Sequence, residues 1–449
     1  MCGIAGTFYN SNFNNGIEVS IADIKLALEA VAKKNGSDLL LDLAWKYKSN
    51  INFIRFCKEN SERIQLSELC LSIKKEAEKK RNLISLIDKS QSLDLYKKSV
   101  KEYENIMDAH WFLSEEIYRW VETIEKISDE LVSNLSNENI VLYKDICKVI
   151  HAIDNRLELR GRDSLGISIV FSTLEYKNSH KKTFENKSES YYFVKDNKKE
   201  THAFTFKTCN SIGGLGDNAD EIKKLFIENE HINNLIKSTK IFSATIMAHT
   251  RWASVGAVKI ENAHPTFLTN NLKNNKNQIL SLLNGDIYNY KEIISKAKEE
   301  HLEVINKSEC TNDSLAIPSY LLGKDAIDLD VAAQMSADLS GSFAIAIQQT
   351  INPEKIILLK KGIQGLYLGF SYDGLMFASD VYGLVESCKY FIPIETDTCF
   401  EINALNNPSK DNLNFSILDS KSHSYKDIYK DRLQITNITT RDIDKRGYK

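Results

Sequence analysis

Met1-Cys2-Gly3-Ile4-Ala5-Gly6-Thr7-Phe8-Tyr9 is the stretch that decides how the rest of the chain is interpreted. Its apolar residues predict a β-strand over residues 3–9. If Met1 is removed, Cys2 carries a thiol and a free α-amine on one Cα. An α-amine titrates at about pH 8, so part of it can accept the thiol proton at neutral pH. By itself, the stretch favours a cysteine that merely begins a buried strand, and distant residues change that interpretation.

The composition excludes several classes of function. A formal charge of −3 over 449 residues gives no indication of nucleic-acid or membrane-surface binding. The eight cysteines lack CxxC pairs and histidine partners at ligand spacing, so we predict neither disulfides nor a metal site. No apolar run is long enough to span a membrane, and no signal peptide is recognisable. We therefore expect a cytoplasmic protein that needs no cofactor.

A long segment without glycine or proline indicates a separate helical module. Neither residue occurs from Ser37 to Arg160, whereas both punctuate the C-terminal half. Ser20 can cap a first helix over residues 21–31. Similar amphipathic stretches follow at about 38–58, 62–88, 92–135 and 137–158, with Trp45, Trp111 and Trp120 as core anchors. We predict an all-α antiparallel helical bundle over residues 18–148.

The remainder of the chain alternates short strands with a few helices. The predicted strands are residues 166–171, 241–248, 279–283, 342–347 and 356–359. The predicted helices lie around 219–238, 290–300, 313–322 and 329–339. This pattern predicts an α+β sandwich with sheets inside and helices outside. Because strand 3–9 must join these sheets, we predict one domain over residues 1–17 and 149–449, with the bundle inserted as a second domain.

Polar residues follow the predicted strands and suggest chemistry. Arg251 ends one strand, and its planar guanidinium suits an amino acid's carboxylate. Asn284 and Gly285 end another, where a side-chain amide and an open backbone N–H can stabilise an oxyanion. Asp313 opens a helix and could bind an α-ammonium. Taken singly, Asn-Gly favours a turn and Asp313 an ordinary helix start. Together with Cys2, these residues are what amide hydrolysis requires.

Six motifs in order carry a family resemblance. They are Cys2-Gly3-Ile4-Ala5-Gly6, Leu157-Glu158-Leu159-Arg160-Gly161-Arg162-Asp163-Ser164-Leu165-Gly166-Ile167, Ala248-His249-Thr250-Arg251-Trp252-Ala253, Asn262-Ala263-His264-Pro265, Asn284-Gly285-Asp286-Ile287-Tyr288-Asn289-Tyr290 and Phe377-Ala378-Ser379-Asp380. The set resembles the glutaminase domain of class II glutamine amidotransferases, which are N-terminal-nucleophile (Ntn) hydrolases. It is most similar to the glucosamine-6-phosphate synthases (glutamine:fructose-6-phosphate amidotransferases). The similarity covers residues 1 to about 15 and 150–449, and it implies a four-layer αββα fold.

The resemblance also implies a reaction and site residues. The reaction is hydrolysis of L-glutamine to glutamate and ammonia through a thioester on Cys2. Asn284 and Gly285 would form the oxyanion hole. Arg251 would bind the α-carboxylate and Asp313 the α-ammonium of glutamine.

Further residues receive roles from the same resemblance. Trp252 would be a gate near the ammonia exit, and Thr250 would belong to the glutamine-binding residues. Arg160 and Gly161 would border the nucleophile and its amine. Glu309 is the less favoured substitute for the α-ammonium ligand.

Three departures from the family pattern stand out. Leu283 replaces a histidine before the Asn-Gly pair, and Ser254-Val255 replaces Thr-His after the Arg-Trp-Ala segment. These two changes question glutamine affinity. Arg162 replaces a tyrosine that faces the sugar-phosphate half of the synthases, which questions the ammonia acceptor. The helical module has no counterpart in the ordinary synthases.

The C-terminal residues suggest a partner. Residues 440–449 resemble the start of the linker to a sugar isomerase domain, so we expect a synthase domain or subunit as partner, from a truncated or a split enzyme. The sequence leaves undecided whether the chain forms a homo-oligomer. One alternative is a glutaminase domain like that of asparagine synthetases, although an SGGxDS pyrophosphate loop is lacking. Another is a weakly active scaffold or regulatory module that recruits partners through the bundle.

Overall fold

Two compact units make up the chain. The computed structural model describes residues 2–11, 17–33, 36–87, 92–174, 184–196, 199–210, 214–272, 275–324, 327–372, 374–404, 415–419, 434–435 and 438–445. The sheet unit comprises Met1–Asn12, Asp145–Asn437 and Lys449, and the helical unit comprises Phe13–Lys144 and Ile438–Tyr448. Residues 438–448 therefore group with the helices, although the sequence placed them with the sheets. The domain boundaries stay a prediction.

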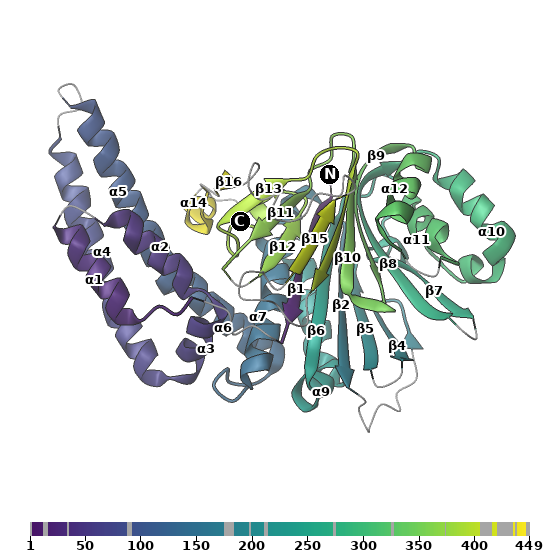
Figure 1. The fold of residues 1–449 in the computed structure, drawn as a ribbon, viewed down its shortest axis with the longest axis horizontal. Coiled ribbons are helices and arrows are strands. Elements are labelled where there is room, and N and C mark those ends of the chain that lie inside the picture. Colours follow the sequence, from purple (N-terminus) through teal and green to yellow (C-terminus); the bar gives the residue numbers. More distant parts are fainter. Residues whose placement is uncertain are drawn as a thin grey trace. The chain divides into compact units, whose positions relative to one another are not determined.

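Two antiparallel sheets form the centre of the sheet unit (Figure 1). Among the described residues, the larger has ten strands in the order β16 (Gln434–Ile435), β13 (Tyr390–Pro393), β11 (Tyr367–Phe370), β12 (Leu375–Ala378), β1 (Gly3–Asn10), β6 (Ile241–Arg251), β2 (Ser164–Leu174), β5 (Lys199–Thr208), β4 (Glu189–Asp196) and β3 (Phe184–Glu185). The described strands of the smaller are β15 (Phe415–Asp419), β14 (Thr398–Ala404), β10 (Asn352–Lys361), β9 (Gly341–Gln349), β8 (Asn275–Ile287) and β7 (Thr266–Leu272). All predicted strands are present, including the first.

Helices cover the outer face of each sheet, which confirms the predicted α+β, four-layer αββα fold. On the larger sheet lie α8 (Asp217–Glu228) and α9 (Glu230–Ser238), with ring contacts from Phe226 to Phe206 and from His231 to Tyr191. On the smaller sheet lie α10 (Tyr290–Asn306), α11 (Ala316–Leu321) and α12 (Leu329–Asp338).

Alternation along the strands decides which side chains enter the space between the sheets. In β1, Ile4 belongs to the apolar cluster that both sheets share. In β8, Leu282 belongs to the same cluster, whereas Leu283 lies in the cluster between the smaller sheet and its helices. Because successive side chains of a strand point to opposite faces, residues two positions from Ile4 and Leu282 also point inward.

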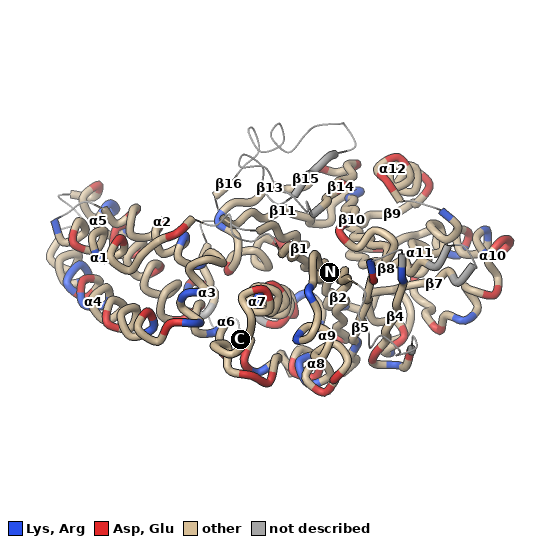
Figure 2. The backbone as a smooth tube through the Cα atoms, turned by 60° about the horizontal axis from the view of Figure 1, so that its bottom comes forward, with Lys and Arg blue, Asp and Glu red and all other residues tan. Residues whose placement is uncertain are grey.

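The helical unit contains the predicted bundle. Its described helices are α1 (Ile21–Ala32), α2 (Ser37–Tyr47), α3 (Asn50–Lys58), α4 (Asn60–Ser85), α5 (Leu93–Trp111), α6 (Ile117–Ser128), the first half of α7 (Asn137–Ala152), and α14 (Thr440–Lys445). Ser20 caps α1 as predicted, through a capping box with Asp23. Figure 2 shows basic and acidic residues mixed along α4 and α5. Among the described residues, no helix has the length and apolarity to cross a membrane.

Two of the helices predicted before residue 136 are interrupted, as is the predicted helix 219–238, which divides into α8 and α9. The stretch 38–58 is two helices, because Ser49 has an extended backbone that ends α2 and caps α3. The stretch 92–135 contains a π-helical turn at Phe112–Glu116, and it ends at Ser128 because Asp129 is left-handed, with φ at 52°. A single sequence does not reveal these breaks, because the apolar periodicity continues through them.

Buried charges and aromatic rings together form the core of the bundle. The Trp45 ring lies 4.7 Å from that of Phe112, and the Lys48 ammonium lies 4.1 Å from the centre of the Trp45 ring. Lys48 also forms an ion pair with the fully buried Glu116. A charge inside an apolar core is tolerated only when it is paired in this way.

Helix α14 is held by the same core. The Thr440 hydroxyl donates to Glu116 and accepts a hydrogen bond of 2.7 Å from Trp111 Nε1. The buried Arg441 guanidinium donates to Asp108 Oδ1 at 2.6 Å and also pairs with Glu104. Burial raises the pKa of Asp108, and the Arg441 charge opposes that rise. The inserted helices therefore fix a segment that comes more than three hundred residues later in the chain.

We expect Arg441→Met to release α14 from the bundle, because it leaves Asp108 buried without its cation. Hydrogen–deuterium exchange should show loss of amide protection over residues 438–445. Arg81→Met, at an exposed arginine of α4, is the control and should leave protection unchanged. Equal protection in both variants would contradict the assignment.

Candidate functional site

Cys2 and Asn284 meet between the two sheets. Cys2 precedes β1 and lies two positions before the inward-facing Ile4, and Asn284 lies two positions after Leu282 in β8. Both side chains are therefore directed between the sheets. The Cys2 nitrogen donates to Asn284 Oδ1 at 3.0 Å, across 282 positions of sequence. This bond orients the amide, so Asn284 Nδ2 is the group left to donate elsewhere.

The Cys2 thiol lies against the backbone of Trp252. The Trp252 N–H donates to Cys2 Sγ at 3.4 Å, and the thiol can donate to the Trp252 carbonyl at 3.6 Å. Burial raises the pKa of the thiol, while the nearby Arg251 charge lowers it. The Trp252 side chain is 56% exposed. A thiol in this setting needs a base to become a nucleophile.

Two side chains hold the start of β1 in place. Thr250 Oγ1 accepts a hydrogen bond from the Gly3 N–H at 3.2 Å. Ser379 Oγ accepts from the Ile4 N–H at 2.9 Å, and it can donate to the Cys2 carbonyl at 3.4 Å. Ser379 belongs to the motif Phe377-Ala378-Ser379-Asp380, but the resemblance implies no role for it. Its part in fixing Cys2 depends on β12 lying beside β1, which the motif does not reveal.

Two glycines allow close backbone approaches at the site. Gly285 has φ at 119°, and a Cβ there would lie 2.1 Å from the Ser342 carbonyl. A Cβ on Gly161 would lie 2.5 Å from the Arg251 carbonyl carbon and 2.6 Å from the Trp252 nitrogen. Any larger residue at either position would displace backbone that lines the site.

Arg251 is a buried cation near the thiol. Its guanidinium donates to the Val255 carbonyl at 2.6 Å and to the Ala257 carbonyl at 3.2 Å, which fixes the loop after β6. These two bonds use part of its five N–H donors. The remaining donors make no hydrogen bond within the described residues and can bind an anionic group.

Asp313 supplies a carboxylate to the site, opposite in charge to Arg251. Asp313 Oδ2 accepts from the N–H of Ile287, the last residue of β8, at 2.8 Å. Burial and the neighbouring Asp286 raise the Asp313 pKa to about 6. The preceding loop is fixed by Asn262, whose Oδ1 accepts from the Thr311 N–H at 2.8 Å. Asp313 and Arg251 both influence the pKa of the Cys2 thiol, so the three groups lie within one electrostatic environment.

The other predicted residues lie further from the thiol. The Arg160 guanidinium pairs with Asp380, beside Ser379. Glu309 is exposed, and its backbone carbonyl accepts from Lys259 Nζ at 3.0 Å. Glu309 lines a separate cavity, so its side chain does not join the group around Cys2.

The departures from the family pattern have local explanations. The Leu283 side chain belongs to the apolar cluster under the helices, on the far face of β8 from Asn284. Ser254 Oγ donates to Asp286 Oδ1 at 2.7 Å, while Val255 offers only its carbonyl, to Arg251. The Arg162 side chain is exposed.

The described residues contain no group of three or more His, Cys, Asp or Glu able to hold a metal ion. His249 and His264 stack with ring centres 4.0 Å apart, and burial lowers the pKa of both. Neutral imidazoles in this position contribute hydrogen bonds to β8, where Leu283 N donates to His264 Nδ1 at 3.3 Å.

Comparison with known proteins finds one family and several relatives. Residues 264–386 match the glutamine amidotransferase domain family. Glutamine–fructose-6-phosphate aminotransferase (isomerizing) of Bacteroides thetaiotaomicron is 28% identical over 173 residues, which are 38% of this chain and 27% of that protein. The enzyme of the same name from Acidithiobacillus ferridurans is 32% identical over 153 residues, 33% of this chain and 23% of that protein.

One similar solved structure is glutamine phosphoribosylpyrophosphate amidotransferase from B. subtilis. It is 16% identical, with a TM-score of 0.35, and the match covers 57% of this chain and 44% of that one. The chain spans about a quarter of the length of the curated relatives that it matches. The chain is therefore similar, over residues 264–386, to the glutamine amidotransferase domain family, and over about a third of its length to the glutamine–fructose-6-phosphate aminotransferases.

Proposed function

We propose that the sheet unit hydrolyses L-glutamine to glutamate and ammonia with Cys2 as nucleophile. The observation that carries the proposal is the bond between the Cys2 nitrogen and Asn284 Oδ1. It joins the nucleophile's own backbone to the amide that would stabilise the reaction's oxyanion. The match of residues 264–386 to a glutamine amidotransferase domain supports the same activity.

The proposed reaction begins at the thiol. Once Met1 is removed, the Cys2 α-amine takes the thiol proton, which the buried thiol does not release unaided. The sulfur then forms a bond to the glutamine δ-carbon, and the carbonyl oxygen becomes an oxyanion. Asn284 Nδ2 and the Gly285 N–H donate to that oxyanion. Its collapse breaks the carbon–nitrogen bond, the amine returns the proton, and ammonia leaves. Water then hydrolyses the thioester to glutamate and the free thiol.

Two opposite charges would orient the substrate. The free donors of Arg251 suit the α-carboxylate, and the Asp313 carboxylate suits the α-ammonium. Thr250 and Gly161 act indirectly, because they position β1 and the Arg251–Trp252 backbone. The exposed Trp252 ring would serve as the gate toward the ammonia exit. Leu283, which stands where the family has a histidine, does not weaken the proposal. Its side chain lies on the face of β8 opposite Asn284.

The acceptor of ammonia forms the finer part of the proposal. Relatives named glutamine–fructose-6-phosphate aminotransferase support a synthase that aminates a phosphosugar, supplied by a further domain or a partner subunit. A cytoplasmic location fits the eight cysteines, all within described segments and all free of disulfides. Incubation with fructose 6-phosphate and candidate synthases, with detection of the amino sugar, tests the acceptor.

Covalent labelling tests the nucleophile. With 6-diazo-5-oxo-L-norleucine, we expect mass spectrometry to locate one adduct on Cys2, with Met1 absent from the labelled peptide. Cys2→Ala should abolish the adduct and glutamine hydrolysis. Cys70→Ala, in the helical unit, is the control and should retain both. An unlabelled Cys2, or a peptide that still carries Met1, would refute the mechanism.

Asn284→Ala tests the oxyanion hole. Loss of a preorganised donor lowers kcat by about 10²- to 10³-fold, because the interaction is made in the transition state. The KM for glutamine should change little. Asn289→Ala, whose side chain bonds the Asp338 carbonyl instead, is the control and should keep kcat near that of the parent. A kcat within twofold of the parent for Asn284→Ala would exclude this role.

The pH dependence of KM tests Asp313. Its raised pKa, about 6, means that the carboxylate gains a proton as the pH falls through that value. We expect the KM for glutamine to rise about tenfold per pH unit below it, because the α-ammonium loses its partner. Asp313→Asn should give a high, pH-independent KM. Asp286→Asn should move the rise to lower pH, because the like charge of Asp286 helps raise the Asp313 pKa. A flat profile in the parent protein would contradict the assignment.

A further inference from the structure

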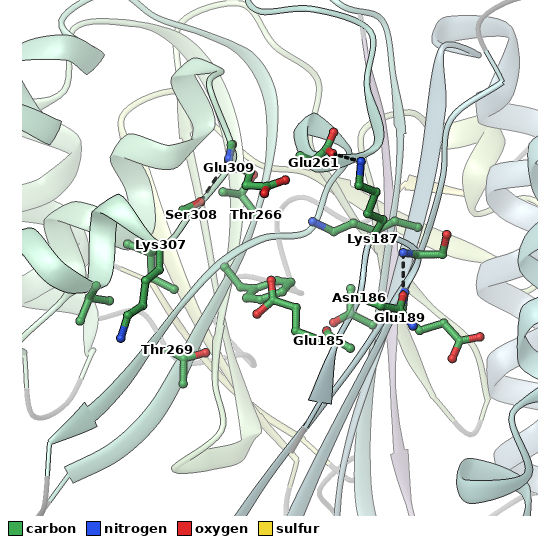
Figure 3. A pocket seen from close by; sticks show the side chains of 18 of the residues that line it. Glu185, Asn186, Lys187, Glu189, Glu261, Thr266, Thr269, Lys307, Ser308 and Glu309 are labelled. Atoms are coloured by element: carbon green, nitrogen blue, oxygen red, sulfur yellow. Dashed lines mark hydrogen bonds and ion pairs between the residues drawn. The ribbon is translucent and has the colours of Figure 1, made fainter. Parts of the chain in front are cut away.

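A cavity of about 710 Å³ lies at the edges of the two sheets (Figure 3). Its walls come from β3, β4 and β5 of the larger sheet, β7 of the smaller sheet, and the end of α10 with residues 307–310. The residues assigned above to glutamine hydrolysis do not line it. The volume is in the range of cavities that hold metabolite-sized molecules.

Three of the charged side chains at this cavity have partners. The Lys187 ammonium pairs with Glu261 Oε1 at 3.3 Å, as Figure 3 shows. Glu189 Oε2 accepts from Asn229 Nδ2 at 3.2 Å. The Lys187–Glu261 pair is neutral overall, whereas Glu189 keeps its negative charge because asparagine is uncharged.

Among the described residues, the Lys207 and Glu185 side chains form no such pair. The Lys207 ammonium lies 4.9 Å from the centre of the Phe267 ring, and it forms no hydrogen bond or ion pair with the described side chains. The Glu185 carboxylate likewise has no such partner in the part of the chain that the structure describes. Each nevertheless influences the pKa of the other, so the two charges face one cavity without closing an ion pair.

Lys207 is half-buried, so its charge is costly to leave unpaired, whereas Glu185 is exposed. Burial lowers the Lys207 pKa to about 8 and raises the Glu185 pKa. Removing a charge from water without a partner is unfavourable, so a ligand that supplies both partners gains from each. An anion alone would meet repulsion from Glu185 and from Glu309, which also lines the cavity. A cation alone would meet Lys207.

We propose that this cavity binds a small zwitterion, whose anionic group lies against the Lys207 ammonium and whose cationic group lies against the Glu185 carboxylate. The Phe267 ring forms the apolar floor beside the anionic end. The Thr269 hydroxyl on β7, which accepts from Gln278 Nε2 at 3.1 Å, also lines the cavity. The site is independent of the glutaminase proposal, because it uses none of the same side chains.

Matched sugars that differ in one charged group test the proposal by isothermal titration calorimetry. Glucosamine 6-phosphate carries both charges, glucose 6-phosphate only the anion, and glucosamine only the cation. We expect the zwitterion to bind at least about tenfold more tightly than either single-charge probe. A Cys2→Ala background excludes any contribution from turnover, and failure of glutamine hydrolysis would leave this result unaffected.

Variants assign each end of the ligand. Lys207→Met should reduce glucosamine 6-phosphate to the affinity of glucosamine, and Glu185→Gln should reduce it to the affinity of glucose 6-phosphate. Lys307→Met, at an exposed lysine of the same rim, is the control and should bind like the parent. Circular dichroism melting checks that each variant is folded. Equal affinity for all three sugars, no detectable heat with the zwitterion, or unchanged affinity in Lys207→Met would overturn the proposal.

Discussion

The face-to-face contact of the two sheets is the constraint on which the rest of the structure depends. Apolar side chains from both inner faces, such as Ile4 and Leu282, exclude water and fix the register of one sheet against the other. Cys2 and Asn284 are simply the next inward positions along the same two strands. The site therefore exists because the core is well packed, and a shift of one residue in either strand would turn one of the two side chains outward.

Placing the site between the two sheets has an electrostatic cost. Burial raises the pKa of the Cys2 thiol and of the Asp313 carboxylate, which are the two groups that the proposed chemistry needs in their charged forms. The buried Arg251 opposes both shifts. The proposed function thus depends on a small set of balanced charges within a largely apolar space. Ser379 and Thr250 contribute by holding the strand rather than by charge.

The helical unit uses buried charge for a different purpose. Lys48, Glu116 and Arg441 are all buried, and each is paired within the unit. Ion pairs of this kind add little net stability, but they select one arrangement because any other leaves a charge unpaired. The arrangement selected here places α14 against α5. The cavity with Lys207 and Glu185 is the contrary case, in which opposite charges stay apart.

Much of this protein is readable from its sequence. Period-two runs predict the strands, the region without glycine or proline predicts the helices, and ordered motifs predict the domain family, because local patterns record which face of each element is buried. The sequence could not reveal that Ser379 holds Cys2 or that Arg441 joins the inserted helices. Those facts depend on which distant strands and helices become neighbours, and only the packing of the whole chain decides that.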